Sequence, residues 1–226
     1  MIMTSPARRH QQRVLAAKAA ASAAPGTAVV GREYDLMLRK LSIDRRRLKE
    51  LQSVARKIEV KAEVLPDYAP YVDGVLMAGK GGQDDVLTTV MIWRVDVGDY
   101  PGALAIARYA LDHRLTLPEH FERALPAAVA EEFADAGLRA AAAGEAFPLD
   151  YLQEVEERTQ KYDMHDQIRA KLLKAIGLAL ESTDKAGALD TLRRAVALND
   201  KIGVKKDITR LEKELGSGAP KGGPAN

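Results

Sequence analysis

The sequence has no cysteine, few aromatic residues and no long apolar run. The absence of cysteine from all 226 residues excludes disulfides and thiolate metal sites, and it fits a reducing compartment. Aromatic residues make up only 5% of the chain, which argues against the stacking platforms that bind RNA or single-stranded DNA. No apolar run approaches the ~20 residues that cross a bilayer. We therefore expect no membrane partner.

The first thirty residues lack the features of a secretory signal. Arg8 and Arg9 precede an apolar segment, but Lys18 interrupts it, and only Val14 and Leu15 within it are strongly apolar. A signal peptide carries an apolar region without such a charge. We therefore expect a protein that is not secreted and that works in the cytoplasm.

Apolar residues make up 46% of the chain, and alanine supplies many of them. Alanine has the highest helix propensity, whereas β-branched and aromatic residues favour strands. Strand-like alternation is absent, and short helical patterns follow one another with Gly, Pro or Asp between them. The sequence therefore predicts an all-α fold, with basic N-terminal helices and a body of short helical hairpins over residues 67–215.

Two segments of this body resemble each other. "DYPGALAIARYAL" (99–111) and "DKAGALDTLRRAV" (184–196) share the frame D-x-x-G-A-L-x-x-x-R-x-A. Small residues at this spacing let the second helix of a hairpin approach the first closely, as in tetratricopeptide-like pairs. Two copies favour a pair of helical hairpins over a continuous solenoid.

The charges are segregated along the chain. Residues 1–80 carry 15 Lys and Arg against 8 Asp and Glu, a net charge of +7. Residues 81–166 carry 7 against 17, a net charge of −10, and residues 167–226 carry 12 against 7, a net charge of +5. An acidic middle between basic ends indicates different partners for different parts of the chain.

Apolar residues recur with a heptad spacing from residue 34 to residue 65. The a positions are Tyr34, Leu41, Leu48, Ala55 and Ala62, and the d positions are Met37, Asp44, Leu51, Ile58 and Leu65. This pattern predicts one long helix over residues 31–66, which Pro66 and Pro70 end. Its apolar seam requires a partner helix, either from a neighbouring subunit or from the same chain. The residues that we expect to serve oligomerisation are Leu41, Leu48, Leu51 and Ile58.

The segment "GVLMAGKGG" (74–82) matches the phosphate-loop pattern G-x-x-x-x-G-K-[ST] at all fixed positions except the last, where Gly81 stands. A phosphate loop follows a buried strand, and its hydroxyl residue coordinates magnesium. Here an apolar quartet, 75–78, precedes Gly79 and favours a helix. We therefore predict that Gly79 caps a helix C-terminus, and we expect no nucleotide or other cofactor.

Asp84 and Asp85 follow this segment and precede an apolar helical pattern. Carboxylates in the first turn of a helix accept hydrogen bonds from free backbone amides and complement the helix dipole. Asp96 and Asp99 lie some 15 Å away at ~1.5 Å per residue, too far to share an ion with Asp84. Capping is therefore our prediction, and we expect no metal site. The alternative is a metal-dependent endonuclease that uses Asp84 and Asp85.

The basic N-terminal part of the chain is the stronger functional candidate. Residues 1–30 are expected to form a basic helix and a linker, and the long helix carries further cations. The predicted DNA-binding residues are Arg8, Arg9, Arg13, Arg45, Arg46, Arg47, Arg56 and Lys57. Such an array binds duplex DNA by releasing counterions from phosphates, and oligomerisation repeats the array. The alternative is a solvated basic helix face without a ligand.

Three segments carry a resemblance to a known family: "TSPARRHQQRVLAA" (4–17), "GVLMAGKGGQDDVLTTVMIWRVDVGDYPGALAIARYAL" (74–111) and "GVKKDITRLEKEL" (203–215). With them, the chain resembles the small terminase subunits of temperate phages with contractile tails, also called terminase endonuclease subunits. The resemblance implies a role in packaging viral double-stranded DNA in the cytoplasm of the bacterial host. It also implies assembly as a homo-oligomeric ring and binding to the large terminase subunit, which carries the ATPase and nuclease.

The residues of this chain depart from what the resemblance implies in two respects, catalysis and the C-terminal tail. Because no carboxylates converge, we attribute cleavage to the complete terminase and site recognition to this subunit. Residues 216–226 are expected to be a flexible tail, without the long basic extension that members of this family can carry. A third hypothesis is a tetratricopeptide-like adaptor that binds only protein.

Overall fold

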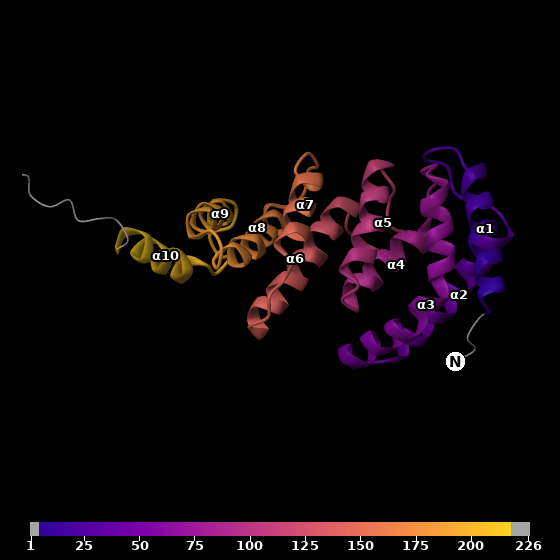
Figure 1. Cartoon of the computed structure of the whole chain (residues 1–226), viewed down its shortest axis with the longest axis horizontal. Helices are drawn as coiled ribbons and strands as arrows, with labels where there is room; N and C mark the ends of the chain where they lie inside the picture. Colours follow the sequence, from indigo (N-terminus) through magenta and orange to yellow (C-terminus); the bar gives the residue numbers. More distant parts are fainter. Residues whose placement is uncertain (1–4, 218–226) are drawn as a thin grey trace, which may run out of the picture. The chain divides into compact units, whose positions relative to one another are not determined.

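The computed structural model describes residues 5–217 (Figure 1). In this part of the chain ten α-helices are present, and β-structure is limited to one isolated bridge. The helices are α1 (Pro6–Ser22), α2 (Arg32–Glu50), α3 (Val54–Ala78), α4 (Asp85–Asp96), α5 (Tyr100–Asp112), α6 (Leu125–Ala143), α7 (Leu149–Thr159), α8 (Asp166–Leu180), α9 (Lys185–Leu198) and α10 (Lys205–Ser217). The predicted all-α fold is confirmed. None of these helices, within residues 5–217, combines the length and apolar character needed to cross a bilayer.

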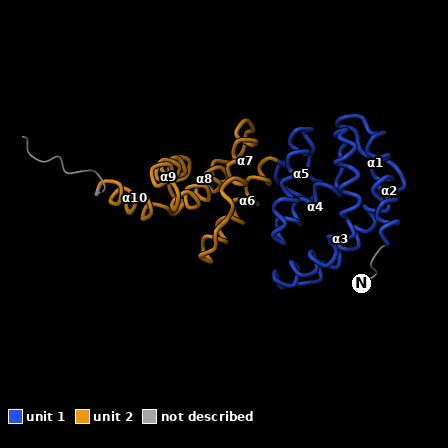
Figure 2. The backbone as a smooth tube through the Cα atoms, viewed as in Figure 1, with its two compact units in different colours: residues 1–125 blue, residues 126–226 orange. Residues whose placement is uncertain are grey.

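The chain divides into two compact units, residues 1–125 and residues 126–226 (Figure 2). The first contains α1 to α5, and the second contains α7 to α10 with almost all of α6. The division falls inside residues 67–215, which the sequence analysis treats as one body. Most of the tail expected to be flexible, residues 218–226, lies outside the described residues.

The prediction of one long helix over residues 31–66 is wrong. Helix α2 ends at Glu50, and the Ser53 hydroxyl accepts a hydrogen bond from the Arg56 amide at 3.3 Å to begin α3. A serine at this position satisfies an amide that would otherwise lack a partner, so it favours a new helix start. The heptad pattern therefore spans two helices.

The prolines do not end the helix either, because α3 continues through Pro66 and Pro70 to Ala78. Each proline removes one helical hydrogen bond. Pro66 is exposed, whereas Pro70 is buried, as are Val64 and Tyr68 on the other side of the helix. Tertiary packing around α3 therefore stabilises the helix through the prolines.

Helix α4 is the most enclosed helix of the first unit. Nine of its 12 residues are buried, as expected for a helix that is apolar on every side. Trp93 of α4 packs edge-on against Tyr68 of α3, with ring centroids 6.0 Å apart. The centre of the unit is therefore formed between α3 and α4.

Helix α1 packs closely on α3 through small side chains. Ala16 and Ala20 are buried, and a Cβ on Gly74 of α3 would clash with the Arg13 carbonyl and with Ala16. The following segment, expected to be a linker, is also anchored: the Val29 amide donates to the Gln83 carbonyl at 2.9 Å. Helix α1 is therefore a fixed part of the first unit.

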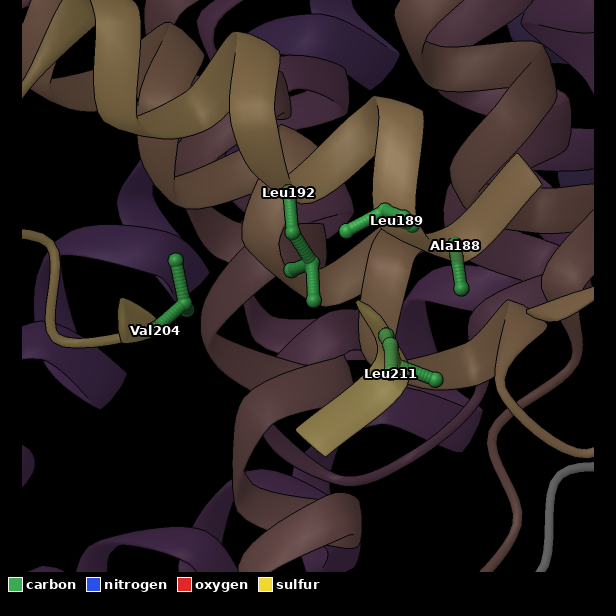
Figure 3. Close-up of a cluster of buried hydrophobic side chains, with 5 residues drawn as sticks. All are labelled: Ala188, Leu189, Leu192, Val204 and Leu211. Atoms are coloured by element: carbon green, nitrogen blue, oxygen red, sulfur yellow. The ribbon is translucent and has the colours of Figure 1, made fainter. Parts of the chain in front are cut away.

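In the second unit, α8, α9 and α10 pack around an apolar cluster (Figure 3). The cluster consists of Ala188, Leu189, Leu192, Val204 and Leu211. Gly177 of α8 lies so close to Leu192 of α9 that a Cβ there would contact the leucine side chain at 2.5 Å. The close approach of α8 and α9 therefore depends on a residue without a side chain.

The repeated frame marks equivalent helix starts in the two units. Asp99 accepts a hydrogen bond from the Gly102 amide at 3.0 Å, and Asp184 accepts one from the Gly187 amide at 2.9 Å. These aspartates cap α5 and α9, which pack on the preceding helices α4 and α8. The D-x-x-G part of the frame is thus a helix cap.

Candidate nucleic-acid interface

Helix α1 carries four basic residues and no acidic one. The Ser5 hydroxyl caps it by accepting a hydrogen bond from the Arg8 amide at 3.3 Å, and Pro6 occupies its first turn. Arg8 and Arg9 are exposed at the end of the helix where its dipole is positive. Cations there oppose the dipole, so these arginines do not stabilise the helix through it.

A groove of 410 Å³ lies between α1 and the proline-containing part of α3. Its walls are formed by Pro6, Arg9, His10, Arg13, Pro66, Ala69, Pro70 and Asp73. Arg13 donates to Nδ1 of His10 at 3.1 Å, so this imidazole holds the guanidinium near the groove. Two arginines against one carboxylate make the groove suitable for a phosphate.

The arginines of α2 differ in how they are held. Arg45 is half-buried and Arg46 is exposed, and neither has a carboxylate within 4.0 Å among residues 5–217. Arg47 is also exposed, but its guanidinium binds both carboxylate oxygens of Glu63 on α3, at 2.9 and 3.3 Å. Arg45 and Arg46 are therefore available to a ligand, whereas Arg47 must first leave Glu63.

Helix α3 provides the last two predicted DNA-binding residues. Arg56 pairs with Glu59 one turn further along the same helix, and both side chains are exposed. Lys57 is half-buried. Exposed pairs of this kind are weak and screened by salt, so phosphate can compete with Glu59 for Arg56.

The C-terminal half of α2 generates a local positive field. Burial and the neighbouring charges of Arg45 and Lys49 lower the pKa of His120. The loop that carries His120 is fixed to the first unit, since the Gln83 side chain bonds the Thr116 amide at 2.8 Å and its carbonyl at 3.0 Å. Cationic side chains of α2 therefore face a fixed loop.

The predicted oligomerisation residues are in two different environments. Leu41 and Leu48 are buried within the chain, together with the other α2 heptad positions. Leu51 is half-buried, and Ile58 is 37% exposed. The α2 part of the apolar seam is therefore covered by the same chain and not by a neighbouring subunit.

Asp84 caps α4, as predicted. Its Oδ1 accepts from the Leu87 amide at 2.9 Å, and its Oδ2 accepts from the Tyr71 hydroxyl at 2.6 Å. The side chain is fully buried, and this burial raises its pKa to about 6. Asp85 instead accepts from the Gln83 amide group at 3.0 Å. The two carboxylates therefore have separate structural partners.

The surroundings of Asp84 and Asp85 do not gather further ligands. Within residues 5–217, no group of three or more His, Asp or Glu side chains is placed to hold a metal ion. The sequence analysis did not predict that the Tyr71 hydroxyl binds Asp84. The available signal was the position of Tyr71, which lies one helical turn from Tyr68 and from Val75 on α3, both of them buried.

A second buried carboxylate was also missed, although the sequence contains its signal. Asp44 is the one polar residue of the heptad pattern, and it is buried. It accepts hydrogen bonds from Tyr68 at 2.6 Å and from Lys40 at 3.0 Å. Lys40 also pairs with Asp67 at 3.1 Å. This network joins α2 to α3 and is structural.

The segment that resembles a phosphate loop has its backbone groups occupied. Gly79 adopts the left-handed conformation (φ 63°, ψ 28°) and caps α3, as predicted. The Gly81 amide donates to the Tyr109 hydroxyl at 2.8 Å, and the Gln83 amide donates to the Thr27 carbonyl at 2.8 Å. These amides are therefore engaged within the protein and do not form a cradle for phosphate.

Comparisons with known proteins agree on one family. Residues 38–167 match the sequence model of the family described as phage small terminase subunit. The chain is 51% identical over 216 residues to the "Terminase, endonuclease subunit" of Escherichia phage P2, covering 94% of this chain and 86% of that protein. It is 27% identical over 207 residues to the "Probable terminase, endonuclease subunit" of Haemophilus phage HP1, covering 85% and 74% respectively. No solved structure matches the chain.

Proposed function

Because the chain belongs to the phage small terminase subunit family, which acts in phage DNA packaging, we propose that it binds viral duplex DNA at the packaging site. The proposal includes assembly as a homo-oligomeric ring that presents the DNA to the large terminase subunit in the host cytoplasm. The observation that carries it is α1, a fixed helix with four basic residues and no acidic one.

The proposed DNA surface lies in the first unit. Arg8 and Arg9 of α1 and Arg46 of α2 are exposed, and each cation that neutralises a phosphate releases counterions. Arg13, Arg45 and Lys57 are half-buried and contribute charge beside them; Arg47 and Arg56 contribute after exchanging Glu63 and Glu59 for phosphate.

We propose that α3 supplies the surface for self-association. Its outward apolar residues, here called the α3 strip, are Ala55, Ile58, Ala62 and Leu65. Their spacing of three and four residues is that of a helix seam, and the first three are exposed while Leu65 is half-buried. A ring assembled in this way repeats a weak basic site and raises the avidity for DNA.

The acidic residues 81–166 are the proposed contact for a protein partner, the large terminase subunit. Their net charge is −10, opposite in sign to the proposed DNA surface. Charge complementarity increases association rates and excludes wrong partners.

Intrinsic cleavage is the second candidate, because the relatives from phages P2 and HP1 are called endonuclease subunits. It would assign catalysis to Asp84 and Asp85. The fully buried Asp84, held by Tyr71 and the Leu87 amide, gives this candidate less support. Magnesium-dependent nicking by the purified subunit, lost in Asp85→Asn with helix content unchanged, would favour it.

One experiment tests the main proposal. The full chain is titrated with duplex DNA over a range of salt concentrations, and its native mass is measured with and without DNA. The expected results are an affinity that falls steeply with salt and a mass several times that of the 24.6 kDa monomer. A monomer without DNA affinity at low salt would overturn the proposal, and binding of the large subunit alone would favour the protein adaptor.

A further inference from the structure

A cavity of 590 Å³ opens on the second unit, between α6, α8 and the segment that joins α6 to α7. Its walls are formed by small residues of two helices, Gly137 and Ala141 on α6 and Ala175 and Ala179 on α8, and Phe147 adds an aromatic ring. Side chains of this size leave the space between the helices open. This space, here called the α6–α8 cavity, has the volume of a typical binding cleft, about 300–1,000 Å³.

The charged residues that line the α6–α8 cavity are both acidic, Glu145 and Glu181. Arg210 donates to Oε2 of Glu181 at 2.7 Å, whereas Oε1 is buried and has no hydrogen-bond partner among residues 5–217. A buried acceptor without a donor is unfavourable. The cavity therefore suits an occupant that brings an apolar side chain for its walls and a cationic donor for Glu181.

The α3 strip has the matching chemistry. Ile58 and Leu65 are its large apolar residues, and Val54, which precedes it, is 71% exposed. Lys57 is half-buried and has no carboxylate within 4.0 Å among residues 5–217. We propose that the α6–α8 cavity receives the α3 strip of a second copy of this chain, with Ile58 as the apolar anchor and Lys57 as the donor to Glu181. The inference rests on the proposed self-association and names the surface that α3 contacts.

A ring requires two different surfaces on each copy. When a surface pairs with the same surface of a second copy, the contact closes a dimer and leaves nothing for a third copy. A head-to-tail contact instead leaves one free surface of each kind at the ends of the assembly, where the next copy can add. A helix strip and a cavity on the same chain are such a pair of surfaces. The proposed ring therefore needs a partner surface for α3 that differs from α3 itself.

Exposed apolar residues of α2 are a poorer match for the α3 strip. Leu36 and Ile43 are exposed, but Arg39 and Arg46 are exposed on the same side of this helix. Like charges across an interface are costly, so these arginines would repel Lys57 of an approaching copy. The carboxylates of the α6–α8 cavity attract the same lysine. Charge complementarity therefore favours the cavity as the surface that binds the strip.

The experiment mixes two variants of the full chain, each with one of the two surfaces blocked. Ile58→Glu places a carboxylate in the strip, and Ala141→Trp fills the cavity from an exposed position on α6. Each variant alone should have the native mass of a monomer. An equimolar mixture should form a heterodimer of twice 24.6 kDa, because the intact strip of one variant meets the intact cavity of the other.

Ala142→Trp is the matched control for the cavity variant. Ala142 is exposed on the same helix but does not line the cavity, so this variant should keep the native mass of the wild type. Circular dichroism of all three variants, recorded before mixing, verifies that the substitutions leave the fold intact.

Lys57→Ala and Glu181→Gln test the polar contact. Each should raise the dissociation constant for self-association by about 10- to 100-fold, since a hydrogen bond between charged groups is lost. The double variant should be no weaker than the single variants, because one contact is lost only once. Self-association is measured without DNA, so that the charge of Lys57 acts on the neighbouring copy alone. Losses that multiply in the double variant would overturn the pairing of these two residues.

The outcomes separate this inference from the proposed function. If the wild type is a monomer, both the proposed ring and the inference are overturned. If Ala141→Trp keeps the native mass of the wild type, or if the mixture of variants stays monomeric, the inference is overturned and self-association through α3 stands. If Ala141→Trp loses only the binding of the large subunit, the cavity docks that protein, and the inference is again overturned.

Discussion

Tyr71 of α3 donates its hydroxyl hydrogen to Oδ2 of Asp84, across 2.6 Å. Neither side chain is accessible, with 1% of Tyr71 and none of Asp84 exposed. The other carboxylate oxygen accepts from the Leu87 amide and caps α4. One buried carboxyl group therefore joins α3 to the first turn of α4.

This arrangement predicts an unusual dependence of stability on pH. Burial raises the pKa of Asp84 from 3.8 to about 6. Between these values the folded chain holds a proton that the unfolded chain has released, so raising the pH favours unfolding. The stability of the wild type relative to Asp84→Asn should therefore fall as the pH rises from about 4 to about 6, by at most about 3 kcal/mol.

Urea unfolding of both proteins across this pH range measures the effect. Other carboxylates titrate equally in the two proteins, so the difference between their unfolding free energies isolates Asp84. A difference that stays constant over the range would contradict the raised pKa.

The two aspartates of the repeated frame allow a comparison of two capping mutants, one at the start of α5 and one at the start of α9. Asp99→Ala and Asp184→Ala each remove a hydrogen bond to the amide of a glycine three residues later. Loss of such a cap costs about 1 kcal/mol. Hydrogen exchange should report faster exchange at the start of α5 in the first variant and at the start of α9 in the second. Equal effects of either mutation on both helices would contradict local capping.

Local signals in the sequence predict the fold class and several helix ends. Gly79 ends α3 and Asp84 begins α4 as expected, because a cap depends on residues within one helical turn. Alanine and leucine likewise indicate helices without knowledge of the tertiary structure. These features require only neighbouring residues, so one sequence is sufficient to predict them.

Long-range packing accounts for what the sequence did not predict. The heptad pattern continues across Ser53, although the helix does not: its α2 positions are buried within the chain, whereas Ala55, Ile58 and Ala62 of α3 are exposed. The pattern also leaves open whether a neighbouring subunit or the same chain covers Leu41 and Leu48. Similarly, the attachment of α1 depends on Gly74, more than fifty residues away from Ala16, and no local pattern connects them.

Gly74 provides a direct test of how α1 is attached. Gly74→Val introduces a side chain against the Arg13 carbonyl and Ala16, and overpacking of this kind costs about 1–3 kcal/mol. The amides of α1 should then exchange faster with solvent, and DNA affinity should fall if α1 contributes to it. Met77→Val is the control, since Met77 lies on the same helix and is 72% exposed. Unchanged protection of α1 in Gly74→Val would show that its attachment does not depend on this contact.

If the α3 strip mediates self-association, a charged substitution within it should lower the oligomeric state. Ile58→Glu places a charge in the centre of the strip, and a charge buried without a partner is costly. The native mass should therefore shift toward the monomer. Ile43→Glu is the matched control, because Ile43 is 58% exposed on α2 and lies outside the strip. An equal loss of native mass in both variants would mean that the self-association surface is not confined to α3.

The contrast between Arg46 and Arg47 tests the proposed DNA surface on α2. Arg46→Ala removes an exposed cation, so the dependence of log affinity on log salt should become shallower by about 0.9. Arg47→Ala should have a smaller effect, because its guanidinium is already bound to Glu63, and Glu63→Gln should strengthen DNA binding by releasing it. Titration of the full chain with duplex DNA at several salt concentrations measures all three variants. Equal losses at Arg46 and Arg47 would mean that the ion pair with Glu63 does not weaken the contribution of Arg47, whereas no loss at either would place the DNA on α1 and exclude α2 from the interface.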